Sequence, residues 1–210
     1  MVELWGHGDS PTPEDPARYS VDEYITQFEQ IRHTHGIEQW GVIGQSYGAG
    51  LVINYAIEKP ERVTHVVVTN SRSAFGNLAA QQAGPRDANA AKEHRQQGGD
   101  VRKLPYHPIH ARRFPDHVKA ALVEKADAIT PEAIQLGGTL GAQLNCTKRL
   151  EELQMPLLLT NGVYEKSFQT DLAALRARYP SLNVANLDGG HSVNIEDPEG
   201  FNRAVMAFLD

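Results

Sequence analysis

The sequence has a single cysteine, no long apolar run and no excess of positive charge. Cys146 cannot form an internal disulfide, which suits a reducing compartment. No apolar run approaches the length of a membrane-spanning helix. With a net charge of −6, the chain lacks the basic character that nucleic acids and anionic membranes attract. We therefore expect a cytoplasmic protein that binds neither nucleic acid nor membranes.

Internal repeats and low-complexity tracts are also missing, as is usual for an ordinary globular chain. Its 210 residues, 40% hydrophobic and 22% charged, suffice for one domain with a substantial core. Apolar stretches of strand length alternate with stretches whose apolar residues recur at helical spacing. The strands are expected at 39–43, 64–69, 156–160 and 182–187, and the helices at 21–35, 47–58, 171–178 and from 198 onward. This alternation predicts an α/β fold, a mostly parallel sheet with helices on both faces.

Two local features refine this expectation. Residues 1–4 have the composition of the end of a further strand, and a turn rich in glycine and proline should follow at 5–11. The strand at 64–69 is uniformly apolar, which predicts that it is buried on both of its faces.

The middle of the chain differs in character from both ends. Residues 76–150 have the pattern of helices and loops, with breaks expected at the glycine pairs 98–99 and 137–138. They carry 11 basic against 7 acidic residues, a balance of +4, whereas the remainder carries 9 against 19, a balance of −10. We interpret 76–150 as a helical cap inserted between two core parts, 1–75 and 151–210.

The stretch with the clearest chemical meaning is G-Q-S-Y-G at residues 44–48, where an apolar strand meets a helix-forming segment. In a G-x-S-x-G turn, small neighbours let the elements approach closely while the serine hydroxyl points outward. We expect Gly44 and Gly48 to provide that room and Ser46 to be a nucleophile. The N-terminus of the next helix would stabilise negative charge, with the backbone N–H of Tyr47 as a donor in the oxyanion hole.

A serine nucleophile requires a base and a carboxylate that orients the base. On a parallel sheet these groups should follow the carboxyl ends of strands. His191, which follows the strand at 182–187, is the expected base, and Glu165, after the strand at 156–160, is the expected acid. Asp188 also lies near the base in sequence and could be only a turn former. The order Ser46, Glu165, His191 is that of hydrolases with this serine turn.

Four motifs together resemble those of the α/β-hydrolase superfamily. They are G-H-G-x-S at 6–10, the serine turn at 44–48, Gly162-x-x-Glu165, and Gly190-His191 before the last helix. The resemblance implies a serine hydrolase without cofactor or metal, and the capped shape is similar to the esterase, enol-lactonase and carbon–carbon hydrolase group. Glutamate stands where that group more often has aspartate, but it supplies the same carboxylate.

The resemblance also implies strands ahead of residue 1 and a second oxyanion donor from a loop among them. We therefore expect a chain shortened at its N-terminus, in which the strand at 39–43 forms an exposed apolar edge. The turn at 6–10 matches a later turn of the family, so we do not assign it to the oxyanion hole.

The expected reaction is hydrolysis of a small-molecule ester or lactone through an acyl-enzyme. Carbon–carbon bond hydrolysis or perhydrolysis at the same residues, or a catalytically silent chain, remain alternatives. Arg112 and Arg113 are candidates for gripping a substrate carboxylate, against the ordinary interpretation of a solvated pair. His107 and His110 have a spacing that could bind metal, but without acidic or cysteine companions we favour a structural role.

Overall fold

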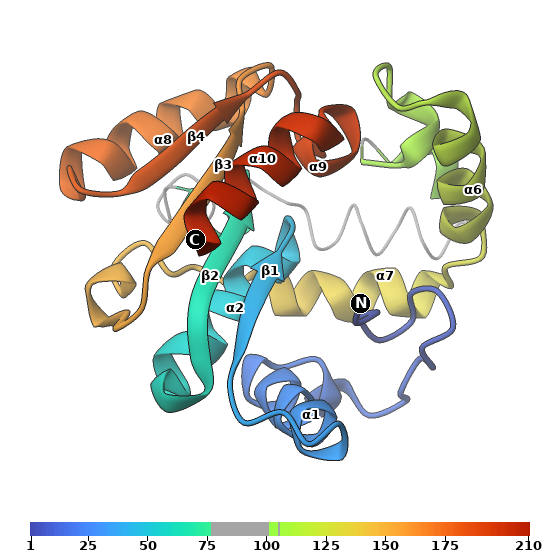
Figure 1. Ribbon diagram of the computed structural model, residues 1–210. Helices are drawn as coiled ribbons and strands as arrows, with labels where there is room; N and C mark the ends of the chain where they lie inside the picture. The colour runs from blue at the N-terminus through green and yellow to red at the C-terminus, as the bar shows by residue number, and fades with distance from the viewer. Residues whose placement is uncertain (77–100, 105) are drawn as a thin grey trace. The chain divides into compact units, whose positions relative to one another are not determined.

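The computed structural model describes residues 1–76, 101–104 and 106–210 (Figure 1). These residues divide into two compact units. One unit contains Met1–Ser20 and the described residues between 79 and 140. The other contains the described residues from 21 to 76 together with Gly141–Asp210. The sheet belongs entirely to this second unit.

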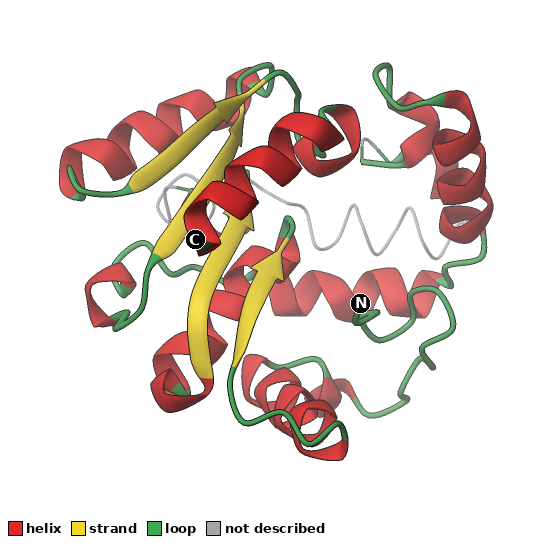
Figure 2. Ribbon diagram, viewed as in Figure 1, coloured by secondary structure: helices red, strands yellow, loops and turns green. Residues whose placement is uncertain are grey.

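Four parallel strands form the sheet, in the order β1-β2-β3-β4 (Figure 2). Their bounds are Trp40–Gly44, Val63–Thr69, Leu157–Gly162 and Asn183–Leu187. The predicted α/β class with a parallel sheet is therefore confirmed. β1 is an edge strand of this sheet, and its Ile43 side chain is 56% exposed. β2 is internal, and Val66, Val67 and Val68 are at most 2% exposed, so this strand is buried on both faces as predicted.

Helices cover both faces of the sheet (Figure 1). On one face, α9 (Val193–Glu196) and α10 (Pro198–Leu209) pack against β3. Pro198 begins α10, and the Asp197 side chain accepts the N–H of Gly200, so this helix starts where the sequence predicted. The apolar cluster beneath consists of Val67, Leu158, Val193, Phe201 and Val205, with Ala185, Leu187 and Phe208 beside it.

The second face is covered by α2 (Tyr47–Glu58), which contacts β1 and β2. The short helix α3 (Arg72–Phe75) packs against α2 and against α8 (Lys166–Arg178). α2 is buried on nearly all sides, from Ala49 to Ala56. α8 begins five residues before the expected start at 171, because Phe168 already packs in the core, 6.3 Å from the ring of Phe75.

A buried polar network joins α1 (Val21–Thr34) to the rest of this unit. Tyr55 donates to Glu29 at 2.7 Å and accepts from the Trp40 indole at 3.1 Å. The Arg32 guanidinium donates to both carboxylate oxygens of Glu29, at 2.8 and 3.0 Å. Arg32 foremost, and Tyr55 in addition, lower the pKa of Glu29 to about 2. The ionised carboxylate therefore links α1, α2 and β1.

The first unit contains the N-terminal turn, α6 (Asp116–Asp127) and most of α7 (Pro131–Gly141). The turn at 5–11 is present, with Gly6 and Gly8 at positive φ. α7 runs through 137–138 without interruption, so the predicted break there was wrong. A Cβ at either of these glycines would meet no atom within 4 Å among the described residues, so no close contact requires glycine at these positions. The break expected at 98–99 lies outside the described residues.

Residues 1–4 do not form a strand, which corrects the expectation from the sequence. Their polar groups are used by the following turn instead. The carbonyl of Glu3 accepts the hydroxyl of Ser10 at 3.1 Å, and its carboxylate accepts the N–H of Asp9 at 2.8 Å.

Short 3-10 helices complete the structure, at Pro16–Arg18, Pro60–Arg62, Val101–Lys103, Pro108–His110 and Leu150–Glu152. Between β2 and β3 the described residues are helical or irregular, as predicted for that region. Its role as a cap stays a prediction. In the described ranges, none of the helices combines the length and apolarity that crossing a bilayer requires.

The Glu29 network leads to a stability prediction. Glu29→Gln should lower the free energy of unfolding at pH 7 by about 1–3 kcal/mol, because Arg32 loses its ionic partner in a largely buried place. A carboxylate with a lowered folded pKa stabilises above its unfolded value, and that contribution disappears as the pH falls through the folded value. The difference between variant and parent should therefore shrink between about pH 5 and pH 2. Urea unfolding across this range measures it.

The exposed Glu38 offers a matched control. Only its backbone carbonyl accepts a hydrogen bond from Arg32, at 3.4 Å, so Glu38→Gln removes the same charge and leaves that bond in place. The prediction would be contradicted if the loss of unfolding free energy in Glu29→Gln did not change with pH, or if both substitutions lowered that free energy equally.

Candidate active site

Four strand ends meet at one edge of the sheet, since all four strands are parallel. Ser46 follows β1, Ser71 follows β2, Glu165 follows β3 and His191 follows β4. The structure thus brings together the three residues that the sequence proposed as nucleophile, acid and base. All of them belong to the same compact unit.

Ser46 stands in a strained turn between β1 and α2. Its φ of 53° is the only positive value at a non-glycine residue in the described part of the chain. Such a conformation costs roughly 1–3 kcal/mol and persists only where its surroundings enforce it. A Cβ at Gly44 would collide with the backbone of Gly48, so Gly44 is required for the close approach of strand and helix. A Cβ at Gly48 itself would meet nothing within 4 Å in the described structure, which corrects the expectation that both glycines provide room.

Two hydroxyl side chains at the end of β2 fix the backbone of Ser46. The buried Ser71 hydroxyl donates to the carbonyl of Ser46 at 2.7 Å, and the Ser46 N–H donates to the hydroxyl of Thr69 at 3.4 Å. Ser71 also accepts the N–H of Ala74 and so caps α3. The sequence reasoning missed this pair, although a threonine at the end of a buried strand and a serine shortly after it were the available signal.

The His191 ring lies between the serine and the glutamate. Its Nε2 is 3.1 Å from Ser46 Oγ, and its Nδ1 is 3.0 Å from Glu165 Oε1. A carboxylate accepts the Nδ1 proton, which leaves Nε2 free to accept the hydroxyl proton of Ser46. The imidazole is 44% exposed and the carboxylate only 15%, so the ring is open to incoming molecules while its partner is shielded.

The position of Glu165 depends on a close contact between the loops after β3 and β4. A Cβ at Gly162 would overlap the carbonyl of Gly190, so only glycine lets these loops approach. The buried Asn70 side chain donates to the Gly162 carbonyl at 3.0 Å and accepts its N–H at 3.1 Å. Glu165 itself is the residue before α8, and its Oε2 is buried with no hydrogen-bond partner among the described residues. The carboxylate is therefore directed at His191 alone.

The charges around His191 favour its protonated form. The hydrogen bond to Glu165 raises the pKa of the imidazole above its ordinary value, against the opposing effect of burial. The electrostatic attraction of Glu165 and then of Glu196 acts in the same direction as the hydrogen bond. In this arrangement the site stabilises an imidazolium once the ring has accepted a proton.

The N-terminus of α2 lies beside Ser46. Tyr47 is the first residue of this helix, and its N–H has no hydrogen-bond partner among the described residues. Such a donor at a helix N-terminus can stabilise an oxyanion. Its role in an oxyanion hole stays a prediction.

Neighbouring side chains connect the serine turn to the histidine loop. The Gln45 amide donates to the Ser192 hydroxyl at 3.1 Å, a contact that the sequence reasoning did not foresee. Asp188 accepts the hydroxyl of Tyr164 and forms no hydrogen bond to His191 in the described structure. Of the two acids considered, Glu165 is the one in contact with the imidazole.

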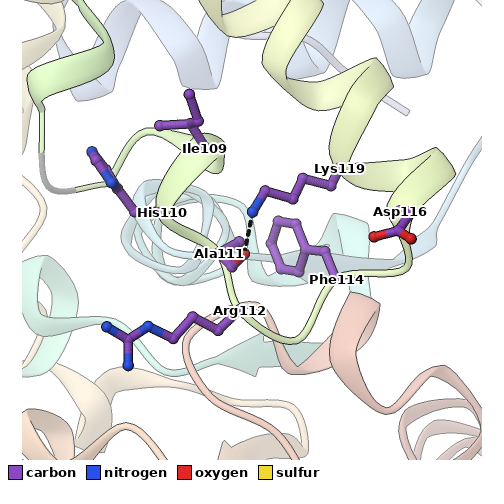
Figure 3. Close-up of a pocket in the computed structure, with 7 residues that line it drawn as sticks. All are labelled: Ile109, His110, Ala111, Arg112, Phe114, Asp116 and Lys119. Carbon is purple, nitrogen blue, oxygen red and sulfur yellow. Dashed lines mark hydrogen bonds between the residues drawn. The ribbon is translucent and has the colours of Figure 1, made fainter.

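The arginines and histidines singled out between β2 and β3 lie in the first unit. Arg112 lines an open pocket of about 440 Å³ there, in which Lys119 donates to the carbonyl of Ala111 at 2.7 Å (Figure 3). Arg113 is exposed and is not among the residues that line this pocket. The full lining is Ile109, His110, Ala111, Arg112, Phe114, Asp116 and Lys119.

Both histidines of the His107-x-x-His110 pair contact other polar groups of the protein through their ring nitrogens. His107 Nδ1 accepts the N–H of Ile109, and its Nε2 lies 3.3 Å from Asp127 Oδ1. His110 Nε2 donates to the carbonyl of Arg102 at 2.8 Å. In the described ranges no group of three or more His, Cys, Asp or Glu side chains is placed to hold a metal ion. These contacts give both residues a structural role.

A family model described as the alpha/beta hydrolase fold matches residues 1–198. The chain therefore belongs to the alpha/beta hydrolase fold family. Among solved structures, MenH from S. aureus superimposes with a TM-score of 0.80 at 20% identity, covering 99% of this chain and 81% of that one. This likeness establishes the fold.

Two Bacillus subtilis proteins are similar in sequence. One, named as a candidate 2-succinyl-6-hydroxy-2,4-cyclohexadiene-1-carboxylate synthase, is 23% identical and aligns over 99% of this chain and 79% of its own length. The other, carboxylesterase YbfK, is 26% identical and aligns over 89% of this chain. The present chain spans 63% of the length of that carboxylesterase.

The hydrogen bond between Glu165 and His191 gives a prediction that is independent of any activity. Glu165→Gln should lower the pKa of His191, because the amide removes the charge-assisted hydrogen bond that contributes most to raising it. NMR titration of the imidazole measures this change. Asp188→Asn is the control, and a larger fall in that variant would contradict the assignment of the carboxylate partner.

Proposed function

We propose that the chain is a serine hydrolase that cleaves a small-molecule ester or lactone, with Ser46 as nucleophile, His191 as base and Glu165 as its orienting carboxylate. The observation that supports this most strongly is the continuous line of two hydrogen bonds, 3.1 Å from Ser46 to His191 and 3.0 Å from His191 to Glu165. A neutral imidazole with Nδ1–H on the carboxylate has its Nε2 lone pair directed at the hydroxyl.

In the first step, Ser46 Oγ attacks the carbonyl carbon while its proton passes to His191 Nε2. The carbonyl π electrons move to oxygen, and the Tyr47 N–H stabilises that oxyanion. Glu165 stabilises the imidazolium that forms. When the tetrahedral intermediate collapses, the bond to the leaving alcohol breaks, and the alcohol takes the proton from His191 Nε2.

In the second step, water attacks the acyl-enzyme and gives its proton to His191. When the second tetrahedral intermediate collapses, its bond to Ser46 Oγ breaks, the carboxylic acid is released, and His191 Nε2 returns the proton to the Ser46 hydroxyl. The mechanism needs no group beyond protein side chains, backbone and water. The carboxylesterase among the similar proteins supports the choice of an ester substrate.

A second candidate is a reaction at the same residues that leaves no acyl group on Ser46. The observation that favours it is the relative aligned over 99% of this chain, whose name is that of a synthase. Reaction of Ser46 with a fluorophosphonate, combined with failure to hydrolyse a panel of esters and lactones, would favour this candidate.

The proposal requires that Ser46 and His191 work as a pair. Ser46→Ala should reduce hydrolysis of p-nitrophenyl esters by at least roughly 10³-fold and abolish fluorophosphonate labelling, because the nucleophile is lost. Parent kcat/KM should rise with pH through the pKa of His191, since only the neutral imidazole accepts a proton. Release of p-nitrophenol measures the hydrolysis, and the intact mass of the protein measures the labelling.

Ser181→Ala serves as the control, because the exposed Ser181 precedes β4 and so lies at the opposite end of that strand from His191. Ester hydrolysis that survives in Ser46→Ala would refute the role of Ser46.

Arg112 and Arg113 belong to the same proposal as binding residues for an acidic substrate. If Arg112 grips a substrate carboxylate, Arg112→Ala should raise KM for a dicarboxylic acid monoester by roughly tenfold and leave KM for a neutral ester unchanged. Arg113→Ala provides the comparison, because Arg113 does not line the pocket of Figure 3. An unchanged KM for the acidic ester in both variants would dismiss this role.

A further inference from the structure

A second glutamate holds the loop that carries His191. Glu196, the last residue of α9, accepts the N–H of Gly190 with its Oε2 at 2.9 Å. A Cβ placed on Gly190 would lie 3.2 Å from both oxygens of this carboxylate, so the glutamate is packed against the peptide that precedes His191. The contact also extends to Gly189, whose Cβ would meet the Cβ of Glu196 at 3.2 Å.

The same loop is fixed at its other points by backbone groups and by Asp197. The Gly189 carbonyl accepts the N–H of Tyr164 at 2.9 Å, and the N–H of Asp188 donates to the Asp197 carboxylate at 3.2 Å. Glu196 holds Gly190, the residue directly before His191. Its carboxylate and that of Glu165 are the two charges that act on His191, from α9 and from the start of α8.

Because Glu196 accepts the N–H of the residue before His191 and packs against that peptide, we propose that it is a positioning residue for His191 that also acts as a second, more distant carboxylate on the imidazolium. This inference rests on the proposed function for its effect on rate. Glu165 contacts Nδ1 directly, whereas Glu196 acts through the Gly190 peptide and through its field. It therefore does not take part in proton transfer.

The expected consequence follows from when the charge appears. His191 is neutral before attack and positively charged in both tetrahedral intermediates, so a nearby negative charge stabilises the intermediates more than the resting enzyme. Removing that charge should lower kcat and leave KM nearly unchanged. Removing the hydrogen bond as well should also loosen the loop.

Two substitutions separate the charge from the hydrogen bond. Glu196→Gln keeps an amide oxygen to accept the Gly190 N–H but removes the charge, whereas Glu196→Ala removes both. Glu199→Gln is the matched control, because Glu199 lies in the first turn of the neighbouring helix α10, its side chain is 90% exposed, and it pairs with Arg203. Thermal unfolding verifies that each variant folds.

The decisive measurement is the pKa of His191 by NMR titration, which needs no substrate. Glu196→Gln should lower this pKa, move the acid limb of kcat/KM to lower pH, and reduce kcat roughly threefold to tenfold with little change in KM. Glu199→Gln should leave all three unchanged. If Glu196 were purely structural, Glu196→Gln would leave the pKa of His191 and kcat unchanged, and only Glu196→Ala would lower kcat. That result would overturn the proposal.

Equal shifts in Glu196→Gln and Glu199→Gln would also overturn it, since they would reflect net charge alone. The proposed function fails separately, if Ser46 in the parent chain neither reacts with fluorophosphonate nor supports hydrolysis. A lowered His191 pKa in Glu196→Gln would then still support the positioning role of Glu196.

Discussion

The parallel hydrogen-bond ladder is the constraint on which the candidate site depends. The ladder places β1 beside β2, β2 beside β3 and β3 beside β4. Because every pairing is parallel, the carboxyl ends of all four strands lie at the same edge of the sheet. Each strand end contributes one element: the serine, the hydroxyls that fix it, the carboxylate and the imidazole. A one-residue slip in any pair would move a contributor by about 3.3 Å and turn its side chain to the other face.

Local strain is concentrated at Ser46, and its neighbours are arranged to hold it. The positive φ of this residue is offset by hydrogen bonds from Ser71 and to Thr69, both of which lie almost fully buried at the end of the adjacent strand. Gly162 plays the corresponding part on the other side of the site, where it lets the loop of Glu165 reach the loop of His191. The backbone therefore sets the geometry that the three side chains share.

Much of the fold could be read from the sequence because periodicity reports directly on burial. Strand positions, the parallel class and the order of Ser46, Glu165 and His191 along the chain follow from apolar runs and from what comes after them. Contacts between residues distant in sequence were not readable in this way, and Ser71 was missed for that reason. The glycine pair at 137–138 was misjudged because tertiary packing stabilises a helix by more than the helix-propensity cost of glycine, which is about 1 kcal/mol per residue relative to alanine. Residues 1–4 were misjudged because a short apolar run does not reveal whether a neighbouring strand is available.

The distance along the chain between the two ends of the site affects how the protein folds. Ser46 and His191 are 145 residues apart, and their contact requires that three parallel pairings have already formed. Parallel pairings over long sequence separations are slow, because chain entropy is lost well before the contacts form. Helices such as α1 and α2 can form much earlier. During refolding, the reactivity of Ser46 should thus return later than the helical signal in circular dichroism. Labelling of this serine would count only molecules whose sheet is complete.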